Sequence, residues 1–389
     1  MSMKKAASIF KKNTMLVVLV LVYLFFMVTT GGSIFKPTNF NALITQNAYV
    51  YILACGMLMC MLTGGNIDLS CGSFVCLLGA IGGVVMTVNG QSAVMGILAM
   101  LLVGILYGCV LGYLVAYVNV PPWIATLAGY LAFRGLGTSI LSKNSKTGSI
   151  PYPADFVKFF SGRVFGTKPN GPMNMTCMIV GAVAAAIVVC AIFWTRANRL
   201  KKGYAADNLY TALAKSVLGA GVILLFMYKL ANNGGIPTVL VWVVAVVLLY
   251  SFITSKTVVG RHFYVVGGNM EAARMSGVNT RRIMFTAYLN MAVLTVVAAW
   301  TVMARFQASN STAGTNYEMD AISACVVGGV SASGGSGTVL GMVIGATLIG
   351  VINLGMSLMG IDANYQKVVK GVVLLGAVAF DILSKKRDR

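Results

Sequence analysis

The chain has 389 residues, of which 58% are hydrophobic and only 10% are charged. About a quarter of the residues of a typical soluble domain are charged, so nine acids and 29 bases cannot coat a soluble protein of this length. This composition excludes an ordinary soluble protein and predicts a surface that faces lipid.

Twelve apolar runs follow one another along the chain, and most reach the roughly 20 residues that a membrane-crossing helix needs. They lie near residues 15–30, 43–63, 70–88, 92–118, 122–141, 173–194, 212–231, 237–254, 282–304, 319–333, 338–359 and 364–384. The run 319–333 is short and rich in Gly and Ser, which favours a half-helix or a re-entrant segment. The basic start resembles a signal peptide, but its cleavage site is poor and many spans follow, so we expect an uncleaved first helix. We predict an all-α, polytopic bundle of about 10–12 spans that forms one transmembrane domain over residues 1–389.

The distribution of basic residues predicts the orientation of the spans. With the N-terminus inside and twelve crossings, the basic segments 1–14, 196–211, 260–281 and 385–389 all face the cytoplasm, as the positive-inside rule requires. This pattern explains the net charge of +20 better than nucleic-acid binding does, so we expect no nucleic-acid partner. The loop 142–172 is an exception, because it carries several bases although the count places it outside.

Cysteine usage predicts neither a disulfide framework nor a metal site. The eight cysteines lie in or beside apolar runs, where Cys behaves as a small hydrophobic residue, and no CxxC pair is present.

The first polar interruption, residues 64–73, carries Asp68, the only acid among the first 154 residues. A carboxylate at membrane depth is costly unless it is paired or faces water, and the glycines around it permit a broken helix. One interpretation is that Asp68 caps or braces the next helix with help from Ser70. The alternative is that Asp68, Asn66 and Ser70 line a translocation path.

The second interruption, residues 260–279, predicts a helix of about two turns. Asn269 is suited to the N-cap, Glu271 lies in the first turn, and Gly277 is suited to end the helix. Because so short a helix is marginal in water, we expect it to dock, either on the membrane surface or in a cleft of a cytoplasmic partner. Its small side chains favour close docking, and Arg274 is a candidate anchor.

The third interruption, residues 308–322, enters an apolar run through Glu318 and Asp320, just after Tyr317. One interpretation is that Asp320 caps a helix, with Glu318 beside it. The other is that both acids belong to a permeation path. An acid that leads a Gly/Ser/Cys-rich run occurs here and at Asp68, once in each half, which hints at the internal repeat common in transporters.

Arg134 lies inside an apolar run, so its guanidinium is expected either to snorkel towards the interface or to pair with a carboxylate such as Asp68. His262, the single histidine, lies at a span end, and an interfacial position is favoured over a role as a proton relay.

Together these segments resemble the monosaccharide branch of the ABC importer permeases, the family of the ribose, galactose and xylose permeases. The matching motifs are G-x-I-D-L-S-x-G-S at 65–73, I-A-T-L at 124–127, F-R-G at 133–135, G-R-x-x-Y-x-x-G-G-N-x-x-A-A-R-x-S-G-[IV]-N at 260–279 and T-A-G-T-x-Y-E-x-D-A-I at 312–322. The basic loop near 196–211 and two further spans before Lys256 are similar to the longer xylose and multiple-monosaccharide permeases. This layout favours xylose, arabinose, glucose or galactose as the transported sugar.

The resemblance implies a permease subunit in the bacterial cytoplasmic membrane, surrounded by lipid, with both termini in the cytoplasm. Two copies, expected to form a homodimer, would enclose the pore, and an extracytoplasmic binding protein would deliver the sugar. A cytoplasmic ABC ATPase, expected to be a tandem polypeptide, would bind ATP and Mg, so this chain would be no enzyme and would bind no cofactor directly. The absence of a GxxxxGK[ST] motif agrees with that division of labour.

The resemblance also implies roles for particular residues. The expected coupling residues are Gly268, Asn269, Glu271, Ala272, Ala273, Arg274, Ser276 and Gly277. The residues expected to line or brace the translocation path are Asp68, Ser70, Asn66, Arg134, Tyr317, Glu318 and Asp320. No catalytic residue and no metal ligand is expected.

Other functions remain open at this point. An ion-coupled secondary transporter would have the same hydropathy, but it needs intramembrane acids, and the best candidates, Asp68, Asp320 and Asp362, lie near span ends. A membrane enzyme is disfavoured, because no paired catalytic constellation is present. Within the ABC importers, a permease for nucleosides or branched-chain amino acids is the alternative.

Overall fold

The computed structural model describes residues 14–166, 173–206 and 208–387, and these residues are mostly helical, with only very short strands between the helices, which confirms the all-α prediction. Of the predicted basic termini, residues 1–13 and 388–389 lie outside the described residues.

The described residues form two compact units. Unit 1 contains the chain up to Ile34, Leu43–Ser161 and everything from Val239 onward. Unit 2 contains Phe35–Ala42 and Gly162–Thr238.

Unit 1 is a helical bundle with one short strand pair. Its helices are α2 (Thr14–Thr29), α3 (Pro37–Leu62, whose first turns belong to unit 2), α4 (Cys71–Gly83) with its π-helical continuation η2 (Val84–Val88), α5 (Ala93–Ala116), α6 (Pro122–Asn144), α7 (Ala154–Ser161), α10 (Thr238–Lys256), α11 (Val258–Gly268), α12 (Met270–Met275), α13 (Thr280–Phe306), α14 (Tyr317–Val327), α15 (Val339–Leu358) and α16 (Ala363–Arg387). Strand β1 (Ser149–Pro151) pairs antiparallel with β4 (Ala308–Asn310), so that Ile150 lies opposite Ser309.

Unit 2 is a helical hairpin. Helices α8 (Met175–Lys201) and α9 (Leu209–Ala231) pack along each other, and β2 (Arg163–Val164) pairs antiparallel with β3 (Ile236–Pro237) beside them. In the chain, the turn at Gly31–Gly32 and the 3-10 helix η1 (Ser33–Phe35) follow α2.

Each of the twelve predicted apolar runs contains a helix, but in the run 319–333 the helix ends at Val327. Nine helices of the described residues are long and apolar enough to cross a membrane, namely α3, α4 with η2, α5, α6, α8, α9, α10, α13 and α15. The other three are α2 with 16 residues, α14 with 11 and α16 with 25. Because a helix of 11 residues rises only about 16 Å, α14 cannot span a hydrocarbon core of about 30 Å, as expected for the run 319–333.

The core of unit 1 is formed by the helices whose sides are all covered. In the most apolar part of α3, 83% of the residues are buried, against 28% in α5. Buried residues of α3 pack against α13, α14 and α15, and a second cluster joins α4, α7 and α13. Helix α3 therefore lies inside the unit, whereas α5 presents most of its surface to lipid.

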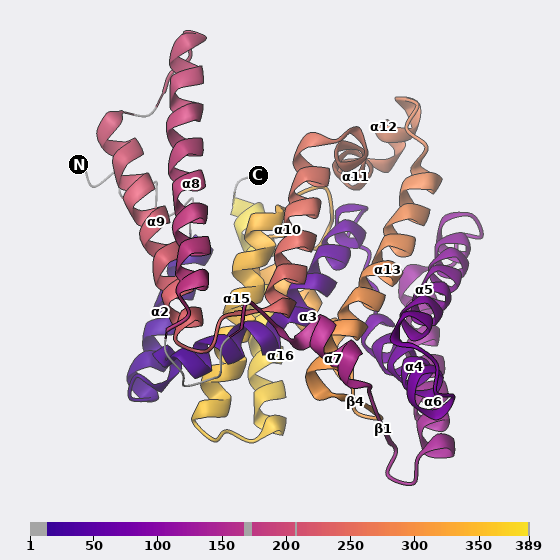
Figure 1. Cartoon of the computed structure of the whole chain (residues 1–389). Coiled ribbons are helices and arrows are strands. Elements are labelled where there is room, and N and C mark those ends of the chain that lie inside the picture. Colours follow the sequence, from indigo (N-terminus) through magenta and orange to yellow (C-terminus); the bar gives the residue numbers. More distant parts are fainter. Residues whose placement is uncertain (1–13, 167–172, 207, 388–389) are drawn as a thin grey trace. The chain divides into compact units, whose positions relative to one another are not determined.

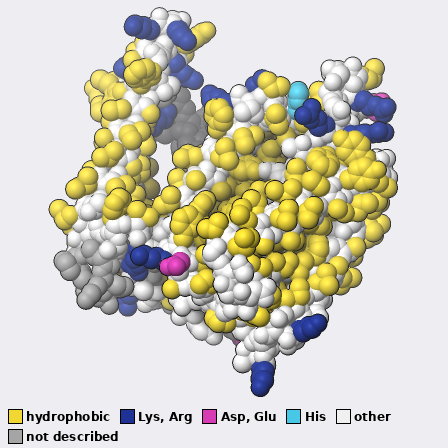
Figure 2. Space-filling model, turned by 45° about the vertical axis from the view of Figure 1, so that its right-hand side comes forward, with side chains coloured by type: hydrophobic (Ala, Val, Ile, Leu, Met, Phe, Trp, Pro, Cys, Tyr) yellow, Lys and Arg dark blue, Asp and Glu magenta, His cyan; other side chains and the backbone are white. Residues whose placement is uncertain are grey.

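The bundle of unit 1 has two distinct ends (Figure 1). Helices α11 and α12 lie at one end, where α10 stops and α13 starts; we call it the α12 end. The strand pair and α7 lie at the other, which we call the strand end. Figure 2 shows hydrophobic side chains over the middle of the visible face and basic side chains gathered towards its ends, as expected of a membrane-embedded surface.

The connection 142–172, expected as a plain loop, contains β1, β2 and the amphipathic helix α7. Phe156 and Phe160 are one turn apart and both are 1% exposed. The Phe160 ring lies 5.4 Å from the rings of Trp242 and Trp300, which fastens this connection to α10 and α13.

Candidate functional site

At the α12 end, glycines of the first and second predicted segments make close backbone contacts with neighbouring parts of the chain. A Cβ atom at Gly267 would overlap the carbonyl oxygen of Leu62, the last residue of α3. A Cβ atom at Gly65 would overlap the carbonyl oxygen of Ala332. Only glycine permits backbones to approach so closely, which explains the glycine-rich sequence at both places.

The loop between α14 and α15 completes this contact. The Gly335 N–H donates a hydrogen bond of 3.2 Å to the Leu62 carbonyl, and the Tyr264 hydroxyl donates one of 2.9 Å to the Gly337 carbonyl. The end of α3, the segment α11–α12 and the loop after α14 thus form one backbone-to-backbone cluster.

Helix α12 has the caps that its sequence predicts. The Asn269 side-chain oxygen accepts the N–H of Ala272 at 2.9 Å, and Gly277, with a φ of 82°, follows the last turn. Ala273 is buried in the chain's own fold, so it anchors α12 and is not available to a partner, contrary to our expectation. The other expected coupling residues are exposed.

The α12 surface also carries apolar side chains that the sequence analysis missed. Met275 is 84% exposed and Met270 is 44% exposed. Their signal in the sequence was a methionine at each end of a six-residue helix whose other exposed positions are small or charged. Exposed methionines are typical of surfaces that adapt to a partner.

Asp68 braces the chain before α4 and does not cap the helix. Its carboxylate accepts hydrogen bonds from the Ser70 N–H at 2.8 Å and the Ser70 hydroxyl at 2.6 Å. Ser70 itself occupies the N-cap position without a side-chain cap bond, and its hydroxyl lies 2.7 Å from the Tyr107 hydroxyl. Burial raises the pKa of the Asp68 carboxyl, and the hydrogen bonds from Ser70 oppose this rise. Asn66 donates to the Thr63 carbonyl in the preceding turn at 3.1 Å.

Arg134 does not pair with Asp68, so that prediction is wrong. Its guanidinium donates to the carbonyls of Ser311 and Ala313 at 3.0 and 2.8 Å. These carbonyls belong to the connection between β4 and α14, where no helix supplies partners. Arg134 therefore ties α6 to the third predicted segment.

Glu318 is a buried acid whose side chain packs against the first predicted segment, residues 64–73. Its side chain is in the first turn of α14, outside the nine membrane-spanning helices, and a Cβ atom at Gly72 would overlap its Oε2 atom. This Oε2 has no hydrogen-bond partner among the described residues. Burial raises the pKa of Glu318 to about 7, so the neutral form is well populated near neutral pH.

Asp320 is not a helix cap, because α14 begins at Tyr317 and Asn316 takes the N-cap position. Its carboxylate accepts a hydrogen bond of 2.6 Å from Tyr49 and forms a 2.8 Å ion pair with Lys370. Asp320 thus joins α3, α14 and α16. Tyr49 and Lys370 were missed by the sequence analysis, although a lysine inside the apolar run 364–384 was a visible signal.

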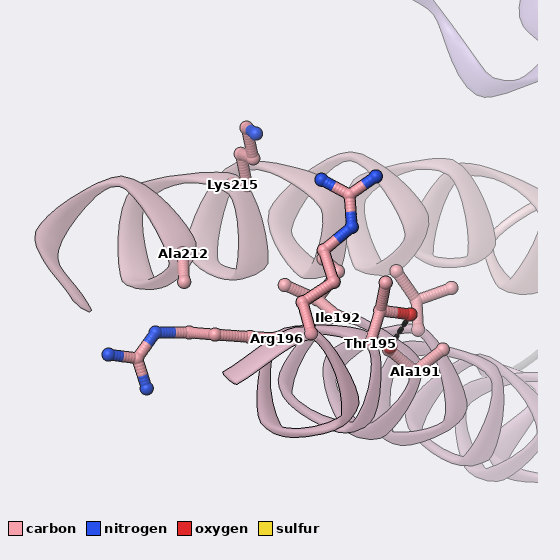
Figure 3. A pocket seen from close by; sticks show the side chains of 8 residues that line it. Ala191, Ile192, Thr195, Arg196, Ala212 and Lys215 are labelled. Carbon is pink, nitrogen blue, oxygen red and sulfur yellow. Dashed lines mark hydrogen bonds between the residues drawn. The ribbon is translucent and has the colours of Figure 1, made fainter. Parts of the chain in front are cut away.

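Among the hollows of the described residues, two differ clearly in their chemistry. A cavity of about 220 Å³ in unit 1, which we call the polar cavity, is lined by residues that include Gln46, Asn47, Tyr49, Arg305, Tyr317 and Asn353. A groove of about 350 Å³ in unit 2 lies between α8 and α9, and Figure 3 shows Arg196 and Thr195 on α8 and Ala212 and Lys215 on α9 among its lining residues. No group of three or more His, Cys, Asp or Glu side chains in the described part of the chain is arranged to hold a metal ion.

Comparisons with known proteins extend over nearly the whole chain. The model of a family described as "Branched-chain amino acid transport system / permease component" matches residues 39–378. The chain is similar to the xylose transport system permease protein of Haemophilus influenzae, with 33% identity over 376 residues and 96% of each chain covered. It is also similar to the ribose import permease protein of Escherichia coli, with 30% identity over 96% of this chain and 94% of the relative. The galactose/methyl galactoside import permease protein of Haemophilus influenzae is 27% identical over 99% of this chain and 98% of the relative. No solved structure matches the chain significantly.

Proposed function

Because this chain belongs to the family of permease components of branched-chain amino acid transport systems, we propose that it is the membrane-spanning subunit of an ATP-driven importer whose cargo is a monosaccharide. Relatives named for xylose and ribose, at 33% and 30% identity over 96% of the chain, support a sugar as the cargo rather than an amino acid. Xylose or a related sugar, such as arabinose, glucose or galactose, is the cargo we propose.

The observation that carries the proposal is the construction of α12. It is a short, well-capped helix that exposes Glu271, Arg274 and Met275 and is anchored through buried Ala273. Since its neighbour α11 touches the end of α3 and the loop before α15, a force on this segment would reach the core helices directly. We propose that α12 docks into a cytoplasmic ATPase and conveys its conformational changes to the bundle.

The proposed function also implies the partner proteins of the chain and its orientation in the membrane. The α12 end faces the cytoplasm of the bacterial inner membrane, together with both termini. Two copies of the chain enclose the pore, a tandem ATPase binds ATP and Mg, and an extracytoplasmic binding protein presents the sugar at the strand end. The chain itself carries no ATPase activity and binds no cofactor.

The proposal is tested with proteoliposomes that contain the chain, its ATPase and its binding protein. We expect uptake of radiolabelled xylose, ribose or galactose that requires both enclosed ATP and the binding protein. Leucine uptake without sugar uptake would assign the chain to amino acid import, as the family's description suggests. Uptake against a gradient by the chain alone, without ATP, would instead identify a secondary transporter.

A further inference from the structure

The polar cavity lies near the strand end of unit 1. It is enclosed by the first half of α3, the last turn of α13, the first turn of α14, the second half of α15 and the start of α16. Since α3 and α13 both reach the α12 end with their other termini, the cavity and α12 lie at opposite ends of the same helices.

Two of its polar groups have unused hydrogen-bonding capacity. The Asn353 side-chain oxygen is buried and has no hydrogen-bond partner in the described part of the chain. The Arg305 guanidinium, at the end of α13, contacts the Phe306 ring but finds no hydrogen-bond acceptor among residues 14–166, 173–206 and 208–387. A buried polar atom without a partner, such as the Asn353 oxygen, is costly, so it indicates a site that a polar ligand or water completes, and the half-buried Arg305 lines the same cavity.

The other side of the cavity is rigid and aromatic. The rings of Tyr49 and Tyr317 stack with centroids 3.6 Å apart and planes at 17°. The hydrogen bond from Tyr49 to Asp320 and the ion pair of Asp320 with Lys370 fix this arrangement. A second amide of the lining, Asn47, is held in place by donating to the Ala346 carbonyl at 2.7 Å.

We propose that the polar cavity is a weak binding site for a monosaccharide within the permease itself. Amide and guanidinium groups offer the donors and acceptors that sugar hydroxyls need, and aromatic side chains offer an apolar wall for the sugar's C–H groups. The volume of about 220 Å³ lies below the roughly 300–1,000 Å³ of pockets for larger ligands, so one sugar ring fits better than a disaccharide. The inference rests on the proposed function, because it places that function's cargo at a defined point of this chain.

The α8–α9 groove is a poorer candidate for the same ligand. Of its eight lining residues, four are the aliphatic Val188, Ala191, Ile192 and Ala212, and three are basic. It contains no aromatic or amide side chain. It therefore lacks both the aromatic wall and the amide hydrogen-bond acceptors that the polar cavity offers to a sugar.

The binding is expected to be weak because a transporter must release what it binds. A site on a translocation path serves only if its affinity is high enough to admit the cargo and low enough to let it leave. We therefore expect a dissociation constant of about a millimolar or above.

Binding is measured on the full chain in lipid nanodiscs, with radiolabelled xylose, ribose and galactose as probes. We expect saturable binding of at least one probe, weakened by about three- to tenfold in Asn353→Leu. This substitution keeps the side chain's size, and the Asn353 oxygen has no hydrogen bond to lose in the described part of the chain. Asn364→Leu is the matched control, because Asn364 is an exposed amide at the start of α16 that does not line the cavity.

Uptake by the complete transporter separates this inference from the proposed function. If the wild-type complex shows ATP-dependent sugar uptake and Asn353→Leu raises the KM or slows uptake by a similar factor, the site is supported. If the wild-type complex imports sugar but no probe binds saturably, or Asn353→Leu leaves both binding and uptake unchanged, the cavity is not a sugar site and the proposed function still stands. If the wild-type complex imports no sugar with ATP, the proposed function itself fails.

Discussion

Glu318 is the residue whose burial makes the clearest prediction about pH. The ordinary pKa of a Glu is 4.5, and burial raises that of Glu318 to about 7. Between these values the unfolded chain binds fewer protons at this residue than the folded chain, so its contribution to stability falls as the pH rises, and levels off above about 7. We expect the thermal unfolding midpoint of the purified chain to fall across this window and Glu318→Gln, which cannot ionise, to remove the fall.

The matched control for this measurement is Glu271→Gln, because Glu271 is exposed on α12. Intrinsic fluorescence followed during heating, at a series of pH values, gives the unfolding midpoints of all three proteins. A slope that persists in Glu318→Gln, or that disappears in Glu271→Gln, would contradict the assignment of the titration to Glu318.

At the same scale, the sequence identified the important acids but not their partners. Asp68, Glu318 and Asp320 stand out because each is an acid beside an apolar run. The partner of Asp320 on α3, Tyr49, is 271 residues away in the chain, and no local pattern relates the two. The wrong pairing of Arg134 with Asp68 has the same cause, because the carbonyls that Arg134 binds carry no signature in a sequence.

At the scale of elements, α12 makes a prediction about coupling. Met275 is 84% exposed at the end of this helix, so Met275→Lys should leave the fold intact while placing a charge in the proposed ATPase interface. We expect sugar uptake and sugar-stimulated ATPase activity of the reconstituted complex to fall together by about tenfold or more. Binding of sugar by the binding protein should not change.

Met359→Lys is the control, because Met359 is 44% exposed at the end of α15. Helix α15 starts beside the α12 end, where the loop before it contacts Leu62. Met359 follows the last turn of α15 and therefore lies at the opposite end of unit 1. Normal coupling in Met275→Lys, or an equal loss in Met359→Lys, would remove α12 from the proposed interface.

Elements were predictable where their signal is local. The caps of α12 and the half-length of α14 follow from Asn269, Gly277 and a short apolar run, all of which can be read within a few residues. Helix α7 was missed because it has only eight residues and depends on Phe156 and Phe160 packing against aromatic side chains of α10 and α13. Its stability is therefore tertiary, and the sequence around it resembles an ordinary polar loop.

In the molecule as a whole, two features of the sequence place residues 142–172 on opposite sides of the membrane. Their basic residues argue for the cytoplasm, whereas the number of spans argues for the outside. In unit 1, β1 from this connection pairs with β4, which follows α13, whereas α12 immediately precedes α13. Because α13 is a single helix of 27 residues, about 40 Å long, β1 and α12 must lie on opposite sides of the membrane.

This arrangement predicts opposite accessibility for two engineered cysteines. Lys146 and Met275 are both exposed, one next to β1 and the other on α12. We expect a membrane-impermeant maleimide to label Lys146→Cys in intact spheroplasts and Met275→Cys only in inside-out vesicles. The wild-type chain serves as the background, because six of its eight cysteines are buried and the other two, Cys109 and Cys190, lie within the spanning helices α5 and α8. Labelling of both variants from the same side would overturn the topology, and labelling of Met275→Cys only from outside would invert the orientation on which the proposed ATPase contact depends.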